Sequence, residues 1–285
     1  MAKNKQTLSV TLATYDEETN LSRCLESIGD LASEIIVVDG SSTDNTREIA
    51  ESLGARVIKT TNPPVFHINK QKANNLAKGD WVLQLDADEI VTSELKKEIK
   101  NLLNDKSFGF NIWVSPLKKL LGKKAKPLVE PASAYYLPRR NYFLGRYLKN
   151  AGQYPDPVIR LFQNGKARLP AKDVHEQMVV IDGTIGWMTG ELDHFATPEF
   201  SRYLSRENRY SSLAAAKLKQ EGEKITILNT INYLFFKPTG TFLSLFLRYR
   251  GFLDGFPGFV FSLYSGFHHA FSYMKLWELY KNDKN

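Results

Sequence analysis

The first third of the chain alternates between the spacing of hydrophobic residues typical of strands and that typical of helices. Apolar runs predict strands at residues 7–13, 34–39, 55–60 and 81–85. Helical spacing lies between them, and the segment 19–31 places Leu21, Leu25 and Ile28 on one face; the other helices are expected at residues 43–53 and 69–78. Repeated strand–helix units predict an α/β fold, with a mostly parallel sheet and helices on both faces.

This alternation weakens after residue 115, and we divide the chain into residues 1–115, 116–199 and 200–285. The middle part still contains strand-like runs at 158–163 and 177–182, and a helix is expected from Glu199 to Lys219. The last part, rich in Phe, Leu, Tyr and Gly, includes a stretch of 19 residues at 256–274 that approaches the length of a membrane span.

Polar residues within 256–274 argue against a membrane-spanning helix. The stretch contains His268, His269 and two glycines and is only moderately apolar. We expect instead helices that lie in a membrane surface, because basic residues suited to lipid headgroups flank them: Lys237, Arg248, Arg250 and Lys275. The alternative is a helical pair that packs on the rest of the protein.

Charge and cysteine content narrow the function classes. The chain has a net charge of +7, and residues 115–172 hold 13 basic but only 2 acidic side chains. Such asymmetry predicts an anionic partner, either a phosphate-bearing substrate, a membrane surface or a nucleic acid, although no nucleic-acid-binding motif accompanies it. The first 18 residues do not have the pattern of a signal peptide and Cys24 is the single cysteine, so we expect a cytoplasmic protein without an intramolecular disulfide.

Carboxylates follow the predicted strands at the edge of the sheet where ligands bind in such folds. Asp86 and Asp88 follow the strand 81–85, and together they can bind a divalent cation that bridges the oxygens of a diphosphate. Asp39 ends the strand 34–39 and can accept hydrogen bonds from a base or ribose, while the residues after it can also simply cap a helix. The loop 13–18, with Thr14, Tyr15 and Glu17, is a candidate wall for the base.

Three segments in this order resemble the motifs of the family 2 inverting glycosyltransferases: SVTLATYDEETNLSRCLESI (9–28), EIIVVDGSSTDNT (34–46) and NKQKANNLAKGDWVLQLDADEIV (69–91). The later segments NYFLGRYLKNAGQYPDPVIRLFQNG, DVHEQ and LDHF resemble the bacterial lipopolysaccharide-core glucosyltransferases. The resemblance implies a GT-A fold, that is, a Rossmann-like mixed sheet with helices on both faces. The composition of the C-terminal part adds a helical segment that we expect to associate with membranes. Residues 1–115 would then bind the nucleotide sugar and residues 116–199 the acceptor.

The resemblance also implies roles for individual residues. A UDP-sugar is the expected donor and Mn²⁺ or Mg²⁺ the expected cofactor; Thr14, Tyr15 and Asp39 would hold uridine, Asp86 the ribose and metal, and Asp88 the metal. Lys72 lies where the family often has an arginine and would bind the diphosphate. His194 would complete the metal shell, as a histidine does in some enzymes of this fold.

Inversion requires a carboxylate base near the attacking hydroxyl, and here the Glu-Asp pair of the family is replaced by Asp173-Val174-His175-Glu176. Glu176 is the first choice for the base, with Asp173 and Asp156 as alternatives, or it only pairs with an arginine. Further side chains could serve the acceptor, with arginines for its phosphates and tyrosines for its sugar rings: Arg139, Arg140, Arg146, Arg160, Tyr142 and Tyr154.

The sequence therefore predicts a metal-dependent enzyme of cell-envelope biosynthesis, peripheral on the inner face of a bacterial cytoplasmic membrane. It would transfer a hexose, with glucose as first choice, to a lipopolysaccharide-core or other lipid-linked saccharide. A polyprenyl-phosphate sugar transferase, which shares the first three motifs, is the alternative enzyme. A non-catalytic module that binds nucleotide sugars or membranes is the alternative from another class.

Overall fold

A computed structural model describes residues 6–104, 132–170 and 177–283. The chain forms two compact units: the first contains residues 1–139 and 156–194, and the second contains residues 140–155 and 195–285. Glu176, the first choice for the base, and Asp173, one of its two alternatives, lie outside the described residues. The functional division of the chain at residues 115 and 199 stays a prediction.

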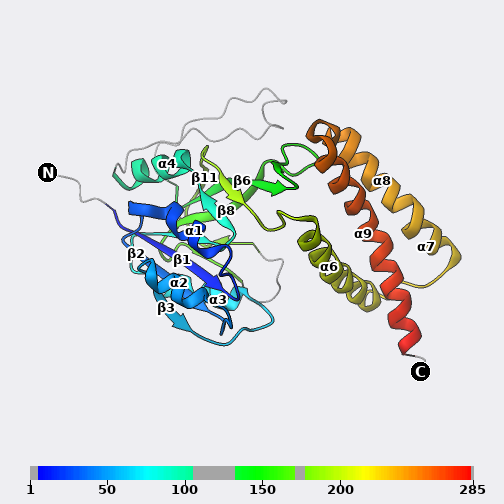
Figure 1. Ribbon diagram of the computed structural model, residues 1–285, viewed down its shortest axis with the longest axis horizontal. Helices are drawn as coiled ribbons and strands as arrows, with labels where there is room; N and C mark the ends of the chain where they lie inside the picture. Colours follow the sequence, from blue (N-terminus) through cyan, green and yellow to red (C-terminus); the bar gives the residue numbers. More distant parts are fainter. Residues whose placement is uncertain (1–5, 105–131, 171–176, 284–285) are drawn as a thin grey trace. The chain divides into compact units, whose positions relative to one another are not determined.

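A mixed sheet forms the centre of the first unit (Figure 1). Its strands follow the order β3-β2-β1-β4-β8-β6-β12-β5, and the first four of these are parallel to one another. β8 is antiparallel to β4, and β6 is antiparallel to β8. β12 is antiparallel to β5. The strands of this path are β1 (Leu8–Thr14), β2 (Glu34–Asp39), β3 (Arg56–Lys59), β4 (Trp81–Leu85), β5 (Glu89–Val91), β6 (Ala134–Phe143), β8 (Asp156–Gln163) and β12 (Leu192–His194).

The chain also contains short strands, and one of them, β10, is shorter than the strand predicted from the sequence. The expected strand at 177–182 is only two residues long and belongs to a separate two-stranded sheet rather than to the main one. Its buried neighbour Met178 packs in a small cluster with Phe162 and Leu169. The short strands are β7 (Arg146–Tyr147), β9 (Ala167–Arg168), β10 (Val179–Val180) and β11 (Ile185–Trp187).

Helices cover both faces of the sheet, as expected. Leu8, Val10 and Leu12 of β1 point to one face and join a core that includes side chains of α1, α2 and α4. On the other face, Thr11 Oγ1 donates a hydrogen bond to Asn74 Oδ1 of α3 at 2.7 Å. The helices of this unit are α1 (Leu21–Ile28), η1 (Gly29–Leu31), α2 (Thr46–Ser52), α3 (His67–Asn75) and α4 (Ser93–Asn104).

The second unit is built mainly from helices, and α9 packs on both α6 and α8 (Figure 1). The predicted helix 199–219 is confirmed as α6. No helix among the described residues is both long and apolar enough to cross a membrane. The helical elements are α6 (Phe200–Gln220), α7 (Ile227–Ile231), η2 (Asn232–Phe236), α8 (Lys237–Leu243), η3 (Ser244–Arg248), η4 (Gly251–Asp254) and α9 (Gly255–Asn282).

Close packing beside β12 gives a test of the first unit. A Cβ atom at Gly190 would lie 2.4 Å from the backbone N and Cα atoms of Leu95. We expect Gly190→Ala to lower the free energy of unfolding by about 1–3 kcal/mol, because backbone atoms would have to move apart. Denaturant unfolding measures this change.

The matched control is Gly240→Ala in α8, where a Cβ atom would meet no other atom within 4 Å. Alanine is the better helix former, so this variant should be as stable as the wild type or more stable by up to about 1 kcal/mol. Equal unfolding curves for Gly190→Ala and the wild type would contradict the close approach of Gly190 to α4.

Candidate active site

The parallel strands bring their carboxyl ends to one edge of the sheet. Thr14 is paired with Asp39, and Leu12 is paired with Leu85, the residue before Asp86. Asp39 is fully buried, and its Oδ2 accepts a hydrogen bond from the backbone N–H of Ser42 at 2.9 Å. The predicted proximity of Thr14, Asp39 and Asp86 at this edge follows from the register of β1 with β2 and β4.

The loops after β1 and β2 are bonded to each other. The backbone N–H of Asp16 donates to Ser42 Oγ at 2.9 Å, and that of Glu17 donates to Thr46 Oγ1 at 2.8 Å. Ser42 Oγ and Thr14 Oγ1 both donate to Asp39 Oδ1, the second at 3.4 Å. Tyr15, by contrast, is 46% exposed at the surface of this loop pair. Asp39 therefore orders the two loops through its own hydrogen bonds, whatever else it binds.

Six charged side chains alternate in sign beside the end of β4. We call this set the ion-pair chain; its order is Lys70, Asp86, Arg160, Glu89, Arg139 and Asp156. Arg160 Nη2 lies 2.5 Å from Asp86 Oδ2 and 2.8 Å from Glu89 Oε1. Arg139 continues the chain, 3.3 Å from Glu89 Oε1 and 2.7 Å from Asp156 Oδ2. The three carboxylates of the chain are thus matched by three cationic side chains.

The neighbouring cations decide the ionisation of the buried acids. Burial alone would raise the pKa of Asp86, but Arg160 and Lys70 outweigh it and hold that pKa well below its ordinary value. Burial likewise opposes ionisation of Glu89, whose pKa is nevertheless lowered by Arg160 and Arg139. Burial favours loss of the Arg160 proton, yet Asp86 and Glu89 raise its pKa. These groups are therefore charged at neutral pH.

Asp88 has the opposite environment although it is only two residues from Asp86. Its pKa is raised to about 6 by burial and by the negative charges of Asp86 and Glu89. His194 of β12 lies opposite Glu89 in the sheet, and its Nε2 is 3.6 Å from Asp88 Oδ2. Burial, with help from Arg139, lowers the pKa of His194 to about 4, so its imidazole is neutral at pH 7.

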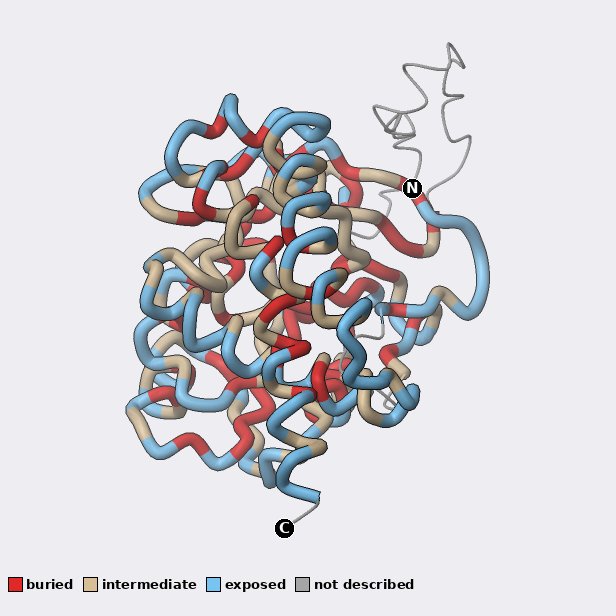
Figure 2. Tube along the Cα trace, turned by 90° about the vertical axis from the view of Figure 1, so that its right-hand side faces the viewer, coloured by how far each residue is buried: buried red, intermediate tan, exposed pale blue. Residues whose placement is uncertain are grey.

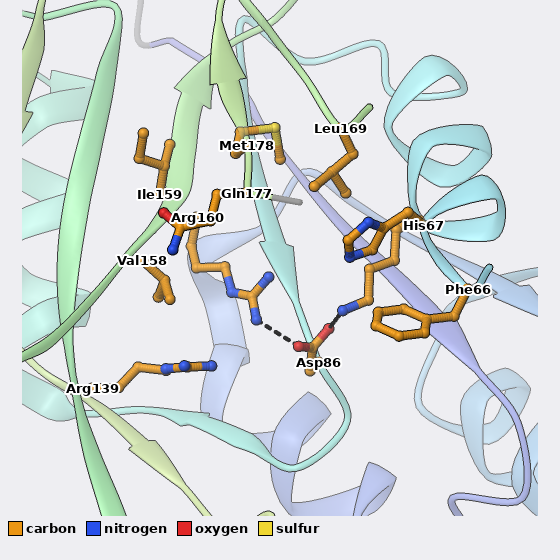
Figure 3. A pocket seen from close by; sticks show the side chains of 11 residues that line it. Phe66, His67, Asp86, Arg139, Val158, Ile159, Arg160, Leu169, Gln177 and Met178 are labelled. Atoms are coloured by element: carbon orange, nitrogen blue, oxygen red, sulfur yellow. Dashed lines mark hydrogen bonds and ion pairs between the residues drawn. The ribbon is translucent and has the colours of Figure 1, made fainter. Parts of the chain in front are cut away.

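A cavity of about 220 Å³ opens beside the ion-pair chain (Figure 3). Asp86 lies on its floor between the guanidinium of Arg160 and the ammonium of Lys70, and Arg139 reaches it from β6. Phe66, Leu169 and Met178 form an apolar part of the wall. The combination of apolar walls, two or more cations and a carboxylate suits a ligand that has both a ring and phosphate groups.

Asp88 and His194 bring together a carboxylate and an imidazole, two donor types that can bind a divalent cation. A neutral imidazole is a metal ligand, and a cation would relieve the repulsion that raises the Asp88 pKa. Asp86, the third predicted ligand, is already bound by Lys70 and Arg160. Among the described residues, no group of three or more His, Cys, Asp or Glu side chains is arranged to hold a metal ion. Any further ligands would have to come from the substrate or from water.

Two predicted roles look different in the structure. Lys72 Nζ donates to Thr60 Oγ1 at 3.1 Å and is absent from the cavity wall, whereas Lys70 contacts Asp86 there. Sequence reasoning missed Lys70, although its spacing of three from the buried His67 and Ala73 marks the inner face of α3. Arg160, expected to bind acceptor phosphates, instead binds Asp86 and Glu89.

The other residues considered for the acceptor lie in the second unit. The Arg140 guanidinium stacks 4.6 Å from the centre of the Tyr147 ring, and Arg146 Nη1 donates to the backbone oxygen of Asp254 at 3.0 Å. Tyr142 packs against Tyr147 and Phe195, and Tyr154 precedes a cis proline. Their roles toward an acceptor stay predictions.

A family model and several relatives are similar to this chain. The model of the family described as glycosyl transferase family 2 matches residues 9–162, which is more than half of the chain. An uncharacterized glycosyltransferase of Rickettsia typhi is 27% identical over 283 residues, covering 98% of this chain and 89% of that protein. The lipopolysaccharide core biosynthesis glycosyltransferase LpsC of Rhizobium meliloti is 26% identical over 268 residues, covering 90% and 86%.

Two solved structures are similar to this chain. Residues 1–349 of Staphylococcus aureus TarS match 95% of this chain and 88% of that chain, with 13% identity and a TM-score of 0.45. The glucosyl-3-phosphoglycerate synthase of Mycobacterium tuberculosis, solved with Mn²⁺, UDP-glucose and phosphoglyceric acid, matches 31% of this chain and 36% of that chain, with 31% identity and a TM-score of 0.28.

The contrast between the two aspartates gives a test in metal-free protein. The folded-state pKa of Asp88 lies above its ordinary value of 3.8, so its ionised form destabilises the fold at neutral pH. We expect Asp88→Asn to raise the free energy of unfolding at pH 7.5, with chelator present, by roughly 1–3 kcal/mol. The gain should shrink as the pH falls from about 6 to about 4, where the wild-type carboxyl becomes protonated in both states.

The matched control is Asp86→Asn, which removes a carboxylate that two cations stabilise. This variant should lose roughly 3–5 kcal/mol, because it leaves Arg160 and Lys70 short of a partner. Urea unfolding at several pH values measures both variants. A loss of stability of equal size in Asp88→Asn and Asp86→Asn would contradict the assignment of different environments.

Proposed function

The chain belongs to glycosyl transferase family 2 and is a glycosyltransferase, and from this premise we propose that it transfers a hexose from a UDP-sugar, with inversion and with the help of Mn²⁺ or Mg²⁺. The first choice for the transferred sugar is glucose. The proposed acceptor is a lipopolysaccharide-core or other lipid-linked saccharide. The observation that carries the proposal is the pairing of Asp88 and the neutral His194 beside the ion-pair chain.

Donor binding is assigned to the edge of the parallel strands. The apolar wall and the cations of the cavity support a site for a nucleotide, with Thr14, Tyr15, Glu17 and Asp39 in the adjoining loops as candidates for the uridine. Lys70 is added to Lys72 as a candidate for the diphosphate, since its ammonium group lines the cavity. Ion pairing with Lys70 and Arg160 would keep Asp86 oriented toward the ribose and metal.

The reaction forms a bond from the acceptor hydroxyl oxygen to the anomeric carbon and breaks the bond from that carbon to the diphosphate oxygen. The hydroxyl proton passes to a carboxylate, for which Glu176 is the first choice and Asp173 and Asp156 are the alternatives. Asp88 and His194 would hold the metal, whose charge stabilises the UDP that leaves. Of the three candidate bases only Asp156 is described, and Arg139 holds its Oδ2 from two nitrogens.

The acceptor assignment rests on composition and on one relative. The 13 basic residues of segment 115–172 suit a phosphate-bearing saccharide. LpsC, 26% identical over most of this chain, is a lipopolysaccharide core biosynthesis glycosyltransferase by its name. We accordingly place the protein at the inner face of a bacterial cytoplasmic membrane as a peripheral enzyme. Product analysis with polyprenyl phosphate and with a core saccharide separates this proposal from the alternative acceptor.

The metal assignment predicts that Asp88→Asn abolishes metal-dependent activity. In a thermal-shift screen, the wild type should be stabilised by one nucleotide sugar and more strongly with Mn²⁺ or Mg²⁺. The variant should lose the metal-dependent part of the shift and at least about 100-fold in transfer rate, since the charge on the leaving group is no longer matched. Asp30→Asn, which removes an exposed carboxylate paired with the surface residue Lys100, is the control and should behave as wild type. Near-wild-type transfer by Asp88→Asn would refute the site.

The base assignment predicts a different defect for Glu176→Gln. Binding of UDP, measured by calorimetry, should be unchanged, while transfer should fall by at least about 100-fold because no group accepts the hydroxyl proton. Asp173→Asn and Asp156→Asn, measured in the same way, identify which carboxylate is the base. If Glu176→Gln weakens UDP binding instead, Glu176 has a structural role and one of the other two acids takes its place.

A further inference from the structure

Large apolar side chains are exposed along the helices between α7 and the start of α9. Exposed residues are pale blue along the tube in Figure 2. We call six of them the apolar face: Ile231, Phe235, Leu243, Leu247, Phe252 and Phe256. Phe235 and Phe256 are 64% and 71% exposed. Single exposed apolar residues are ordinary on protein surfaces, but a run of them marks a place where something binds.

The first four members form one stripe. From α7 to η3 the chain is continuously helical, and the exposed positions 231, 235, 239, 243 and 247 recur every four residues. Such spacing drifts around a pure α-helix, which has 3.6 residues per turn. Here η2 and η3 are π-helical, with wider turns that compensate for the drift. The π turns therefore keep these apolar side chains on one side.

Helix α9 buries Val260, Tyr273 and Leu276 as an ordinary helix would, but it also has a buried row of small residues. Its buried side carries small residues at a spacing of four, Gly258, Ser262, Gly266 and Ala270. A Cβ atom at Gly266 would lie 2.6 Å from the backbone oxygen of Pro238 in α8, so the two helices are in close contact. Five other large apolar residues of α9 are exposed: Phe256, Phe259, Phe267, Met274 and Trp277. Small residues inside and large apolar residues outside are typical of helices that pack in lipid.

Basic residues predominate in the segment that carries the apolar face, although Glu223 just before it accepts hydrogen bonds from Asn229 and Tyr233. Segment 224–259 contains four basic residues, Lys224, Lys237, Arg248 and Arg250, and one acidic residue, Asp254. Asp254 is fully buried, where its carboxylate accepts hydrogen bonds from the backbone N–H groups of Lys149 and Asn150. The charge that this segment presents to its surroundings is therefore positive.

Positive charge beside the apolar stripe helps to decide whether a second copy of the chain or a lipid bilayer covers it. In a two-fold contact with a second copy, the same surface faces itself, and cations would meet cations. An anionic bilayer offers phosphates at the depth of the basic side chains and acyl chains below them. The observed pattern thus fits a lipid surface better than it fits a second copy of the chain.

We propose that the apolar face, with Arg248 and Arg250 at its margin, docks on the surface of an anionic lipid bilayer. The helices lie in the plane of the interface and do not cross it. This inference rests on the proposed function in one respect: it names the surface from which a lipid-linked acceptor would be reached. The docking itself involves no catalytic residue and can be measured without donor or acceptor.

The experiment uses the full chain and two kinds of vesicles, phosphatidylcholine alone and phosphatidylcholine with about a third of phosphatidylglycerol. Cosedimentation should show binding to the anionic vesicles, weakened by salt, with little binding to the neutral ones. The double variant Phe235→Ser/Leu247→Ser should bind roughly tenfold more weakly or worse, because it removes two of the exposed apolar contacts. Arg248→Ala/Arg250→Ala should bind roughly tenfold more weakly and lose part of the salt dependence.

Leu213→Ser on α6 is the matched control, an exposed leucine outside the apolar face, and should bind as wild type. Thermal unfolding identifies any variant that fails to fold. Absence of wild-type binding to anionic vesicles overturns the proposal, as does equal weakening by Leu213→Ser; a stable dimer broken by Phe235→Ser/Leu247→Ser would assign the face to a second copy. Stabilisation by a nucleotide sugar with metal tests the proposed function separately, so either proposal can fail alone.

Discussion

Burial of negative charge at the end of a core strand is the constraint on which the candidate site depends. A carboxylate in such a place is stable only when cations or hydrogen-bond donors are close to it. The first unit meets this need with Lys70, Arg160 and Arg139, which come from α3, β8 and β6. These elements are held together by the sheet, so the ion-pair chain is also a long-range tie between distant parts of the sequence.

The local pattern of the sequence was sufficient for the parallel half of the sheet. Apolar runs located β1 to β4 and the helices between them, and the acidic residues after β4 lie at the edge where the parallel strands end. The second half was harder, because β8, β6 and β12 are antiparallel and are added in an order that differs from their order in the chain. Arg160 illustrates the difficulty. Its partners are 71 and 74 residues away, and only the pairing of β8 with β4 brings them into contact.

The helical part of the chain shows a different limit of sequence reasoning. Hydropathy correctly argued against a membrane-spanning segment, but an average over residues 256–274 does not say which side of the helix is buried. The structure shows that the small residues, Gly258, Ser262 and Gly266, are inside. These small residues allow neighbouring helices to approach closely, but they bury little apolar surface. A hydrophobicity scale therefore does not identify them as the buried side of the helix.

The geometry of the chain after β4 explains why two aspartates so close in sequence have different environments. Asp86 continues the strand and points toward β8 and α3, where the cations lie. The chain then turns, and β5 pairs with β12 so that His194 lies opposite Glu89 and beside Asp88. One acid is thus neutralised by the protein itself, and the other is left beside a neutral imidazole. Under the proposed function, such a pair would separate two tasks, since the first acid is already oriented by the protein and the second would be left for a cation.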